Sequence, residues 1–312
     1  MGWVTRRQKR TRAGIIALRG AETQRSRPTQ MKPNPFAHLN QDIGEVGQRL
    51  FADYLDLQAI KWEYEAVSGD CKPDCLIQHG DAQVIVEVKT VGWPEEWPGD
   101  PFSPDDAVRL KIMKTRRQFR EYKAMPCALA VHAATMFGPQ DPSIMLAAGF
   151  GPGVIPSRDH GSIDPAPTFY RFPDWSDLPE DLKHLSAPML KEGSNRTFSA
   201  LILLGYHAID PLHLEIWKRL YAKQQSGVPL ESGDQFDLLN ELAPRFDRKQ
   251  PPARTPRVIV IENPYARVPF PKDLFRGPFD QGWGWRDGWC GPDWIGTRLE
   301  SLVKEGVPFD ML

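Results

Sequence analysis

Three side chains in one short stretch of the sequence have the types and the spacing that hydrolytic chemistry needs. Twelve residues separate Asp74 from Glu87, and Lys89 comes two residues later. Between them, Gly80-Asp81 is a good two-residue turn, with glycine at the first central position as a type II′ turn prefers. A hairpin closed at this turn places Asp74 opposite Glu87, with Cβ atoms about 4.5–5.5 Å apart.

Two carboxylates held this close repel each other unless a positive charge lies between them. Lys89 can supply one, because side chains two residues apart project to the same face of a strand. A divalent cation can supply the rest: Mg²⁺ and Mn²⁺ take carboxylate oxygens and often one phosphate oxygen of a substrate. The ammonium group could then orient or help deprotonate the attacking water. The pattern indicates metal-dependent phosphodiester hydrolysis.

An ordinary solvated strand face is the competing interpretation of these three residues. It predicts polar side chains along the whole face, but Leu76 and Ile85 lie on that face. The opposite face is also apolar, with Val84, Val86 and Val88. A strand that is apolar on both faces is buried, and charges in a buried strand need partners or a metal. We therefore favour the site.

Hydrophobic periodicity predicts the elements that must position these residues. A helix is expected over 42–57, followed by strands over 62–66, 74–78 and 83–91. After an acidic loop over 92–106, a helix is expected over 107–123 and a buried strand over 127–133. Further along the chain we expect two strands, 199–205 and 257–262, and two helices, 211–223 and 235–242.

The order of these motifs resembles a known family. Pro73-Asp74, twelve residues, and Glu87-Val88-Lys89 are similar to the signature of the PD-(D/E)XK nuclease superfamily, with the ExK in a β-branched strand and the PD at the start of the preceding one. The resemblance covers about residues 40–135 and says little about the rest.

This resemblance implies an α/β, restriction-endonuclease-like core over residues 36–135, with a central mixed β-sheet flanked by helices. It implies Mg²⁺ as the cofactor, with Mn²⁺ able to substitute, and DNA as the substrate. Lys89 is then catalytic and acts on the water. The implied metal ligands, which are catalytic as well, are Asp74, Glu87 and Glu45.

Glu45 and the second helix carry the remaining expected site residues. Members of the superfamily often place a metal-associated Glu on the first helix, and Glu45 matches it; the alternative is a surface salt bridge with Arg49. Gln118 and Tyr122 resemble the Q-x3-Y motif of the RecB-like branch, which implies that they line the substrate cleft. Tyr122 could equally belong to the core.

The second helix is strongly basic, and its positive charges have two interpretations. They could form a solvated helix surface, or they could follow a phosphate backbone. In the second case the expected substrate-binding residues include Arg116, Arg117 and Arg120. RecB-like members that carry an iron–sulfur cluster use four cysteines that flank the nuclease core. Here Cys127 falls inside the core and only Cys290 lies far downstream, so the resemblance implies no such cluster.

Charge is distributed unevenly along the chain, which has 39 basic and 40 acidic side chains. The first 32 residues carry +8 and the remainder −9, so near-neutrality does not exclude a nucleic-acid partner. We expect a disordered basic leader over 1–35, unless the true start is Met31 rather than Met1. Residues 136–312 are expected to extend the same domain or to form a second subdomain.

Cysteine usage and hydropathy bear on the cellular setting. Four cysteines do not form a disulfide framework, and no apolar run approaches the ~18 residues that span a bilayer. We therefore expect a cytoplasmic protein without membrane contact.

The function predicted from these residues is a Mg²⁺-dependent deoxyribonuclease. Two alternatives stay open: a catalytically inactive nucleic-acid-binding or assembly module of the same fold, and a nuclease that acts on RNA. Endonuclease and exonuclease action are equally compatible with the sequence, which also leaves the oligomeric state and the biological pathway open.

Overall fold

The computed structural model describes residues 32–33, 43–65, 72–92, 96–97, 104–133, 142–151, 169–172, 188–246, 249 and 252–308. The basic leader expected over 1–35 lies outside these residues, apart from Lys32–Pro33, which forms β1. β1 pairs antiparallel with β5 (Glu96–Trp97) in a small separate sheet. None of the helices in the described part of the chain has the length and apolar character that crossing a membrane requires.

A nine-stranded mixed sheet forms the centre of the described chain. The neighbouring strands β4, β6 and β8 run parallel, as do β9 and β10, and the other neighbours pair antiparallel. The strands follow one another across the sheet in the order β2 (Lys61–Tyr64), β3 (Cys75–His79), β4 (Ala82–Val91), β6 (Cys127–Ala133), β8 (Phe198–Ala208), β9 (Arg254–Glu262), β10 (Gln281–Arg286), β11 (Trp289–Ile295) and β7 (Tyr170–Arg171).

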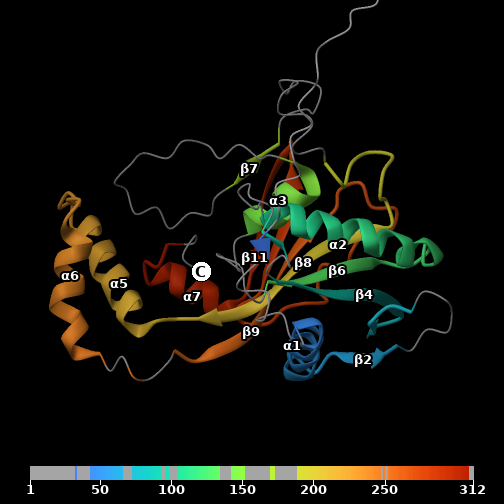
Figure 1. The fold of residues 1–312 in the computed structure, drawn as a ribbon. Coiled ribbons are helices and arrows are strands. Elements are labelled where there is room, and N and C mark those ends of the chain that lie inside the picture. The colour runs from blue at the N-terminus through green and yellow to red at the C-terminus, as the bar shows by residue number, and fades with distance from the viewer. Residues whose placement is uncertain are drawn as a thin grey trace, which may run out of the picture.

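Helices cover both faces of this sheet, which confirms the predicted α/β class (Figure 1). α1 (Ile43–Leu57) packs on one face, and α2 (Pro104–Gln118) and α3 (Pro142–Phe150) pack on the other. Each face has its own hydrophobic cluster, and β4 contributes to both. β4 is therefore buried on both faces, as the apolar pattern of its sequence predicts.

The connection from β4 to β6 determines how α2 lies over the sheet. β6 runs parallel to β4, and its first residue, Cys127, lies beside Ile85 in the first half of β4. α2 must therefore run antiparallel to β4, so that its C-terminal end lies near the start of β6. The helix ends at Gln118, and a 3₁₀ turn over Phe119–Glu121 follows it. The predicted bounds of this helix, 107–123, are therefore wrong at both ends: α2 begins at Pro104, inside the loop expected over 92–106, and gives way to the 3₁₀ turn after Gln118.

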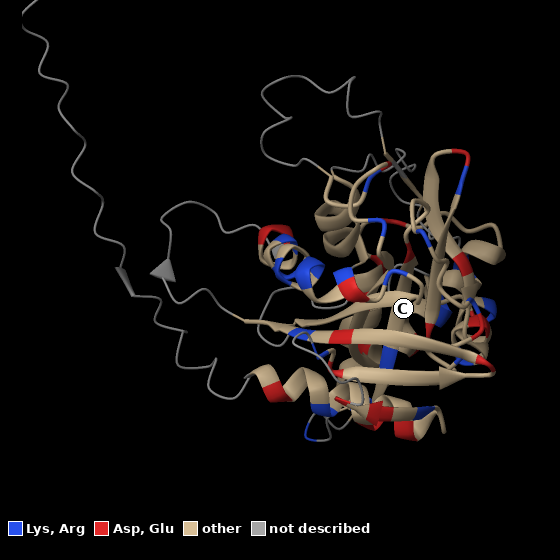
Figure 2. Ribbon diagram, turned by 90° about the vertical axis from the view of Figure 1, so that its right-hand side faces the viewer, with Lys and Arg blue, Asp and Glu red and all other residues tan. Residues whose placement is uncertain are grey.

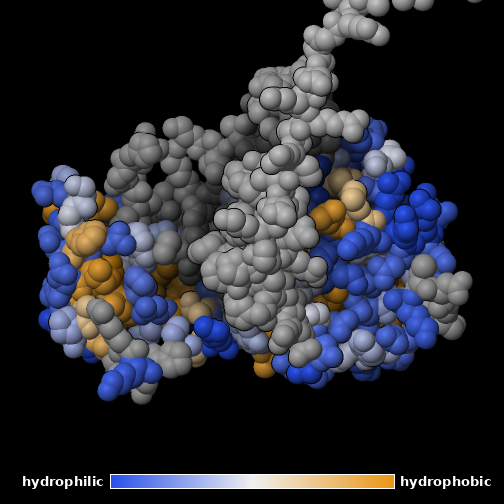
Figure 3. Space-filling view, in the orientation of Figure 1, coloured by the Kyte–Doolittle hydropathy of each residue, from blue (hydrophilic) through white to orange (hydrophobic). Residues whose placement is uncertain are grey.

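The C-terminal half continues the same sheet through β8, β9, β10 and β11. α5 (Pro211–Gln225) and α6 (Asp234–Leu242) pack on each other around a small cluster of their own, whose apolar side chains are visible in orange in the left part of Figure 3. A 3₁₀ turn (Ala243–Arg245) follows α6, and α7 (Thr297–Lys304) packs on a fourth cluster.

Candidate active site

The turn between β3 and β4 sets the register of the hairpin that carries the acidic residues. Gly80 has a φ of +58°, and Asp81 is not among the residues with positive φ, which agrees with a type II′ turn. In the resulting register Ile77 lies opposite Val84 and Cys75 opposite Val86. The predicted pairing is confirmed. The next residue of each strand away from the turn is Asp74 on one side and Glu87 on the other, so this register brings the two carboxylates together.

Backbone hydrogen bonds fix both carboxylates at this position. The N–H of Val88 donates to Asp74 Oδ2 at 2.8 Å, and the N–H of Asp74 donates to Glu87 Oε2 at 3.3 Å. Each carboxylate is thus held by the strand that carries the other. Because of these two hydrogen bonds, the hairpin register determines how far apart the two carboxylates lie.

Two further side chains complete the cluster around Glu87, which is only 1% exposed. The ammonium group of Lys89 contacts Glu87 Oε1 and lies 4.0 Å from Asp74 Oδ2. From α2, Gln118 Nε2 donates to Glu87 Oε1 at 2.7 Å. The structure therefore brings together four residues that the sequence predicts for the site, with a positive charge beside the two negative ones.

Burial governs the electrostatics of this cluster. It raises the pKa of Glu87, and the negative charge of Asp74 raises that pKa further. Hydrogen bonds and charge from Lys89, together with the hydrogen bond from Gln118, act in the opposite direction. An additional cation at this position would therefore stabilise the ionised pair.

Gln48 on α1 is a site residue that the sequence reasoning missed. Its side-chain amide donates to Asp74 Oδ1 at 2.8 Å. α1 approaches β4 this closely because Gly47 lacks a side chain: a Cβ there would lie 2.4 Å from Thr90 Oγ1. The sequence does contain a signal for this contact: Gln48 is a polar residue that directly follows a glycine on the buried side of an amphipathic helix.

Replacing Gln48 by alanine should lower the free energy of unfolding by about 1 kcal/mol, because it removes a partly buried hydrogen bond and leaves an acceptor of Asp74 without its donor. Urea unfolding measures the effect. Gln235→Ala on the exposed surface of α6 serves as the control and should change stability much less. Equal effects of the two substitutions would contradict a structural role for the Gln48 contact.

Glu45 lies one turn before Gln48, on the outer surface of α1. Its carboxylate forms a 2.5 Å salt bridge with Arg49, and its side chain is 64% exposed. This is the surface pairing that the sequence left as the alternative to a metal ligand. The contact from α1 to the acidic pair is made by Gln48.

Tyr122 is a buried residue of the turn that follows α2. The four-residue spacing of Gln118 and Tyr122 predicts that both lie on one face of an α-helix. They do not, because α2 ends at Gln118 and a 3₁₀ turn follows it. Gln118 reaches Glu87, whereas Tyr122 is buried in the hydrophobic cluster that includes Phe119 and Cys127. The structure thus places Tyr122 in the core, the second of its two predicted roles.

The basic residues expected to bind substrate lie on the outer surface of α2 and the turn after it. Arg116, Arg117 and Arg120 are exposed, because Ile112, Thr115 and Phe119 occupy the side that faces the sheet. In Figure 2, basic segments recur along the helix above the sheet, and the right-hand surface in Figure 3 is largely hydrophilic. This placement suits both a solvated surface and a phosphate-binding one.

The donor set at the hairpin suits a hard divalent cation. Asp74 and Glu87 offer carboxylate oxygens, and the Lys89 contacts show that a positive charge fits beside both. Within the described residues, no group of three or more His, Cys, Asp or Glu side chains is arranged to hold a metal ion. A metal here would thus take two protein carboxylates and complete its shell with water or substrate oxygens.

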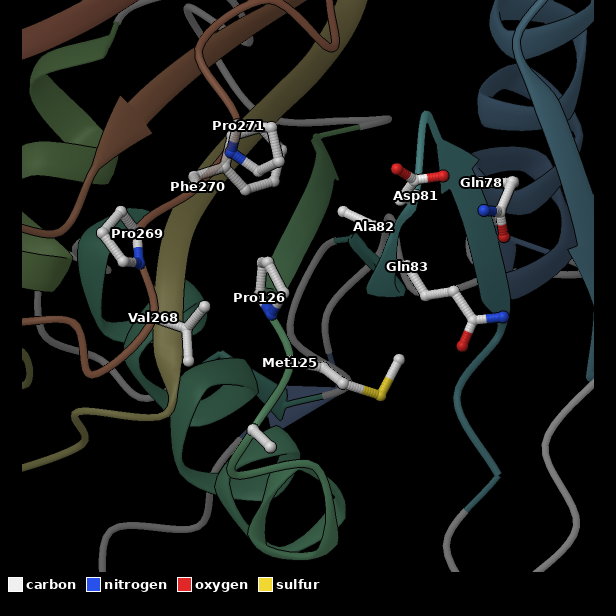
Figure 4. A pocket seen from close by; sticks show the side chains of 11 residues that line it. Gln78, Asp81, Ala82, Gln83, Met125, Pro126, Val268, Pro269, Phe270 and Pro271 are labelled. Carbon is white, nitrogen blue, oxygen red and sulfur yellow. The ribbon is translucent and has the colours of Figure 1, made fainter.

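A separate pocket lies at the other end of β4, about 690 Å³ in volume (Figure 4). It is formed by Ala82 and Gln83 at the start of β4, by Pro126 before β6, and by the segment that contains Val268 and Phe270. Neither Asp74 nor Glu87 lines it. The acidic cluster therefore lies outside this pocket, and hydrogen bonds hold its residues together.

Comparison with known proteins adds no assignment. No family model matches the chain, and no curated protein or solved structure matches it. The chemistry of the site therefore has to be argued from its own residues.

Proposed function

We propose that the protein is a Mg²⁺-dependent nuclease that hydrolyses phosphodiester bonds of DNA. The observation that carries this proposal is the convergence of Asp74 and Glu87 across one hairpin, with the Lys89 ammonium in contact with Glu87 and 4.0 Å from Asp74. Two carboxylates lie beside an ammonium group, near the C-terminal end of the basic helix α2. This arrangement suits a reaction in which water attacks a phosphate.

The order of elements supports a restriction-endonuclease-like core of the PD-(D/E)XK type. α1 comes first, then β2, β3 and β4 with the PD and ExK residues, then α2 and the parallel strand β6. The mixed sheet lies between helices on both faces (Figure 1). These features agree with what the resemblance in sequence implies.

Each residue of the cluster has a role that its contacts suggest. Asp74 and Glu87 would hold the cation, while Gln48 and Gln118 orient their carboxylates. When bound, Mg²⁺ or Mn²⁺ would supply Lewis-acid activation of water and of the phosphate oxygens. The ammonium group of Lys89 is placed to orient the attacking water and to stabilise negative charge that grows on the phosphate.

Replacing Lys89 by alanine should reduce cleavage of plasmid and linear DNA by about 10²–10⁴-fold in the presence of Mg²⁺ or Mn²⁺, since it removes the positioned ammonium group. Lys61→Ala on the exposed edge strand β2 removes the same charge away from the site and should leave cleavage unchanged. Gel assays of supercoiled plasmid and end-labelled linear DNA measure both, and nicking of the plasmid identifies endonuclease action.

Equal cleavage by the wild type and Lys89→Ala would contradict the mechanism. Tight DNA binding without metal-dependent turnover would favour the inactive binding module. Cleavage of RNA but not of DNA under the same conditions would change the substrate and leave the chemistry intact.

A further inference from the structure

Lys111 is a basic residue on α2, the helix whose Gln118 contacts the acidic cluster, and the charge of Lys89 in that cluster acts on it. It comes two turns before Gln118, so the two residues share a face of the helix, about 10 Å apart along its axis. Because α2 runs antiparallel to β4 and Gln118 contacts Glu87, Lys111 lies toward the C-terminal end of β4, on the side of Lys89. It is half-buried, next to the buried residue Ile112.

Among the described residues, the charges that act on Lys111 do not compensate its own. Burial lowers its pKa, and the neighbouring charges that lower it further are both positive, those of Lys114 and Lys89. Within the described residues, no carboxylate is among the groups that act on this pKa. A half-buried ammonium group near two other cations is unfavourable in the free protein unless an anion joins it.

Other partly buried lysines of the described chain differ in this respect. Lys223, with 34% of its side chain exposed, pairs with Asp234 at 2.5 Å. Lys218, with 37% exposed, pairs with Glu305 at the same distance. In both examples a carboxylate pairs with the lysine, whereas no described carboxylate is among the groups that act on Lys111. The position therefore suits an anion that comes from outside the chain.

We propose that Lys111 binds a phosphate of the substrate strand next to the one that is cleaved, and so positions that strand across the acidic cluster. The inference rests on the proposed nuclease function and adds a contact that sets where the strand lies. Lys111 is a positioning residue, because it lies two turns before Gln118 on α2, too far along the helix to share the contact that Gln118 makes with Glu87. The substrate must accordingly be a polynucleotide that carries a phosphate on this side of the cleaved bond.

The test compares Lys111→Met and Lys111→Arg with the wild type, with Lys304→Met on the exposed surface of α7 as a control of equal charge change. Binding to a duplex DNA oligonucleotide is measured without divalent metal at several salt concentrations. For Lys111→Met we expect Kd to rise about five- to tenfold, and the slope of log K against log[salt] to become shallower by about 0.9, the value for one lost phosphate contact. Lys111→Arg should recover most of the affinity, and Lys304→Met should match the wild type.

Kinetics and stability separate positioning from a structural role. With Mg²⁺, Lys111→Met should raise KM by a similar factor and change kcat by less than about twofold, because the contact acts equally on bound substrate and transition state. Its melting temperature should equal or exceed that of the wild type, since the substitution removes a half-buried charge. A lower melting temperature that Lys111→Arg does not restore would overturn the proposal in favour of a structural role.

The outcome for the wild type distinguishes the two proposals. If the wild type cleaves DNA but Lys111→Met binds with unchanged affinity and salt slope, only the inference about Lys111 fails. If the wild type neither binds nor cleaves DNA, the proposed function fails and the inference falls with it.

Discussion

Replacing Glu87 by glutamine is expected to reduce metal-dependent cleavage by about a thousandfold or more, while the folded protein stays at least as stable as the wild type at neutral pH. Glutamine keeps the shape of the side chain and an acceptor oxygen for Gln118. It removes the negative charge that would hold the cation, and with it the stabilisation of charge in the transition state. The expected loss therefore concerns chemistry rather than folding.

The stability part of this expectation follows from the pKa of Glu87, which burial and then Asp74 raise above its ordinary value. A raised pKa means that the folded state holds a proton more tightly than the unfolded state does. The free energy of unfolding contributed by Glu87 is therefore highest at low pH and falls as the pH rises through the folded-state pKa. Glutamine lacks this loss, so its advantage over glutamate should be largest at neutral pH and should vanish below the unfolded-state pKa of about 4.3.

Glu262→Gln offers a matched control for this experiment. Burial also raises the pKa of Glu262, which lies at the end of β9, outside the acidic cluster. Its substitution should leave cleavage unchanged. Urea unfolding between pH 4 and pH 8 and plasmid cleavage with Mg²⁺ measure the two effects. Cleavage by Glu87→Gln at the wild-type rate would rule out Glu87 as a metal ligand.

The sequence predicts those parts of the site whose positions depend on residues close to one another in the chain. The Gly80-Asp81 turn and the alternation of β3 and β4 determine the hairpin register, and the register alone brings Asp74 to Glu87. Gln118 follows from the motif that continues into the next helix. Gln48 was missed because its contact with Asp74 joins residues 26 positions apart, and no local period specifies such a contact.

Several elements of the C-terminal half were not predicted, for physical reasons that the structure makes clear. α3 is apolar around its circumference, so its sequence has no helical period to detect. β10 and β11 contain glycines and a proline that usually indicate turns. Two of these glycines make room for neighbouring rings: a Cβ on Gly282 would meet Trp294, and one on Gly291 would meet Phe169. Tertiary packing, rather than local propensity, selects these residues.

A buried polar network joins α1 to the C-terminal half and has the largest expected effect on stability. Asp280 is 1% exposed and accepts hydrogen bonds from Tyr54 at 2.5 Å, from the backbone N–H of Val258 at 3.0 Å and from that of Gly277 at 2.6 Å. Arg257 is buried nearby; burial lowers its pKa to about 10, and the charge of Asp280 acts against that decrease. One carboxylate thus satisfies three donors and offsets a buried cation.

Replacing Asp280 by alanine should lower the free energy of unfolding by about 3–5 kcal/mol, because it leaves a buried guanidinium without this anion and three buried donors without their acceptor. Tyr54→Phe, which removes only the hydroxyl donor, should cost about 1–2 kcal/mol. Guanidinium chloride unfolding measures both. Since Tyr54 lies on the helix that carries Gln48 to Asp74, Tyr54→Phe should also loosen the support of the acidic cluster and reduce cleavage modestly. A loss below about 1 kcal/mol for Asp280→Ala would show that water or a rearranged side chain replaces the carboxylate, and that α1 is held in place by its apolar contacts alone.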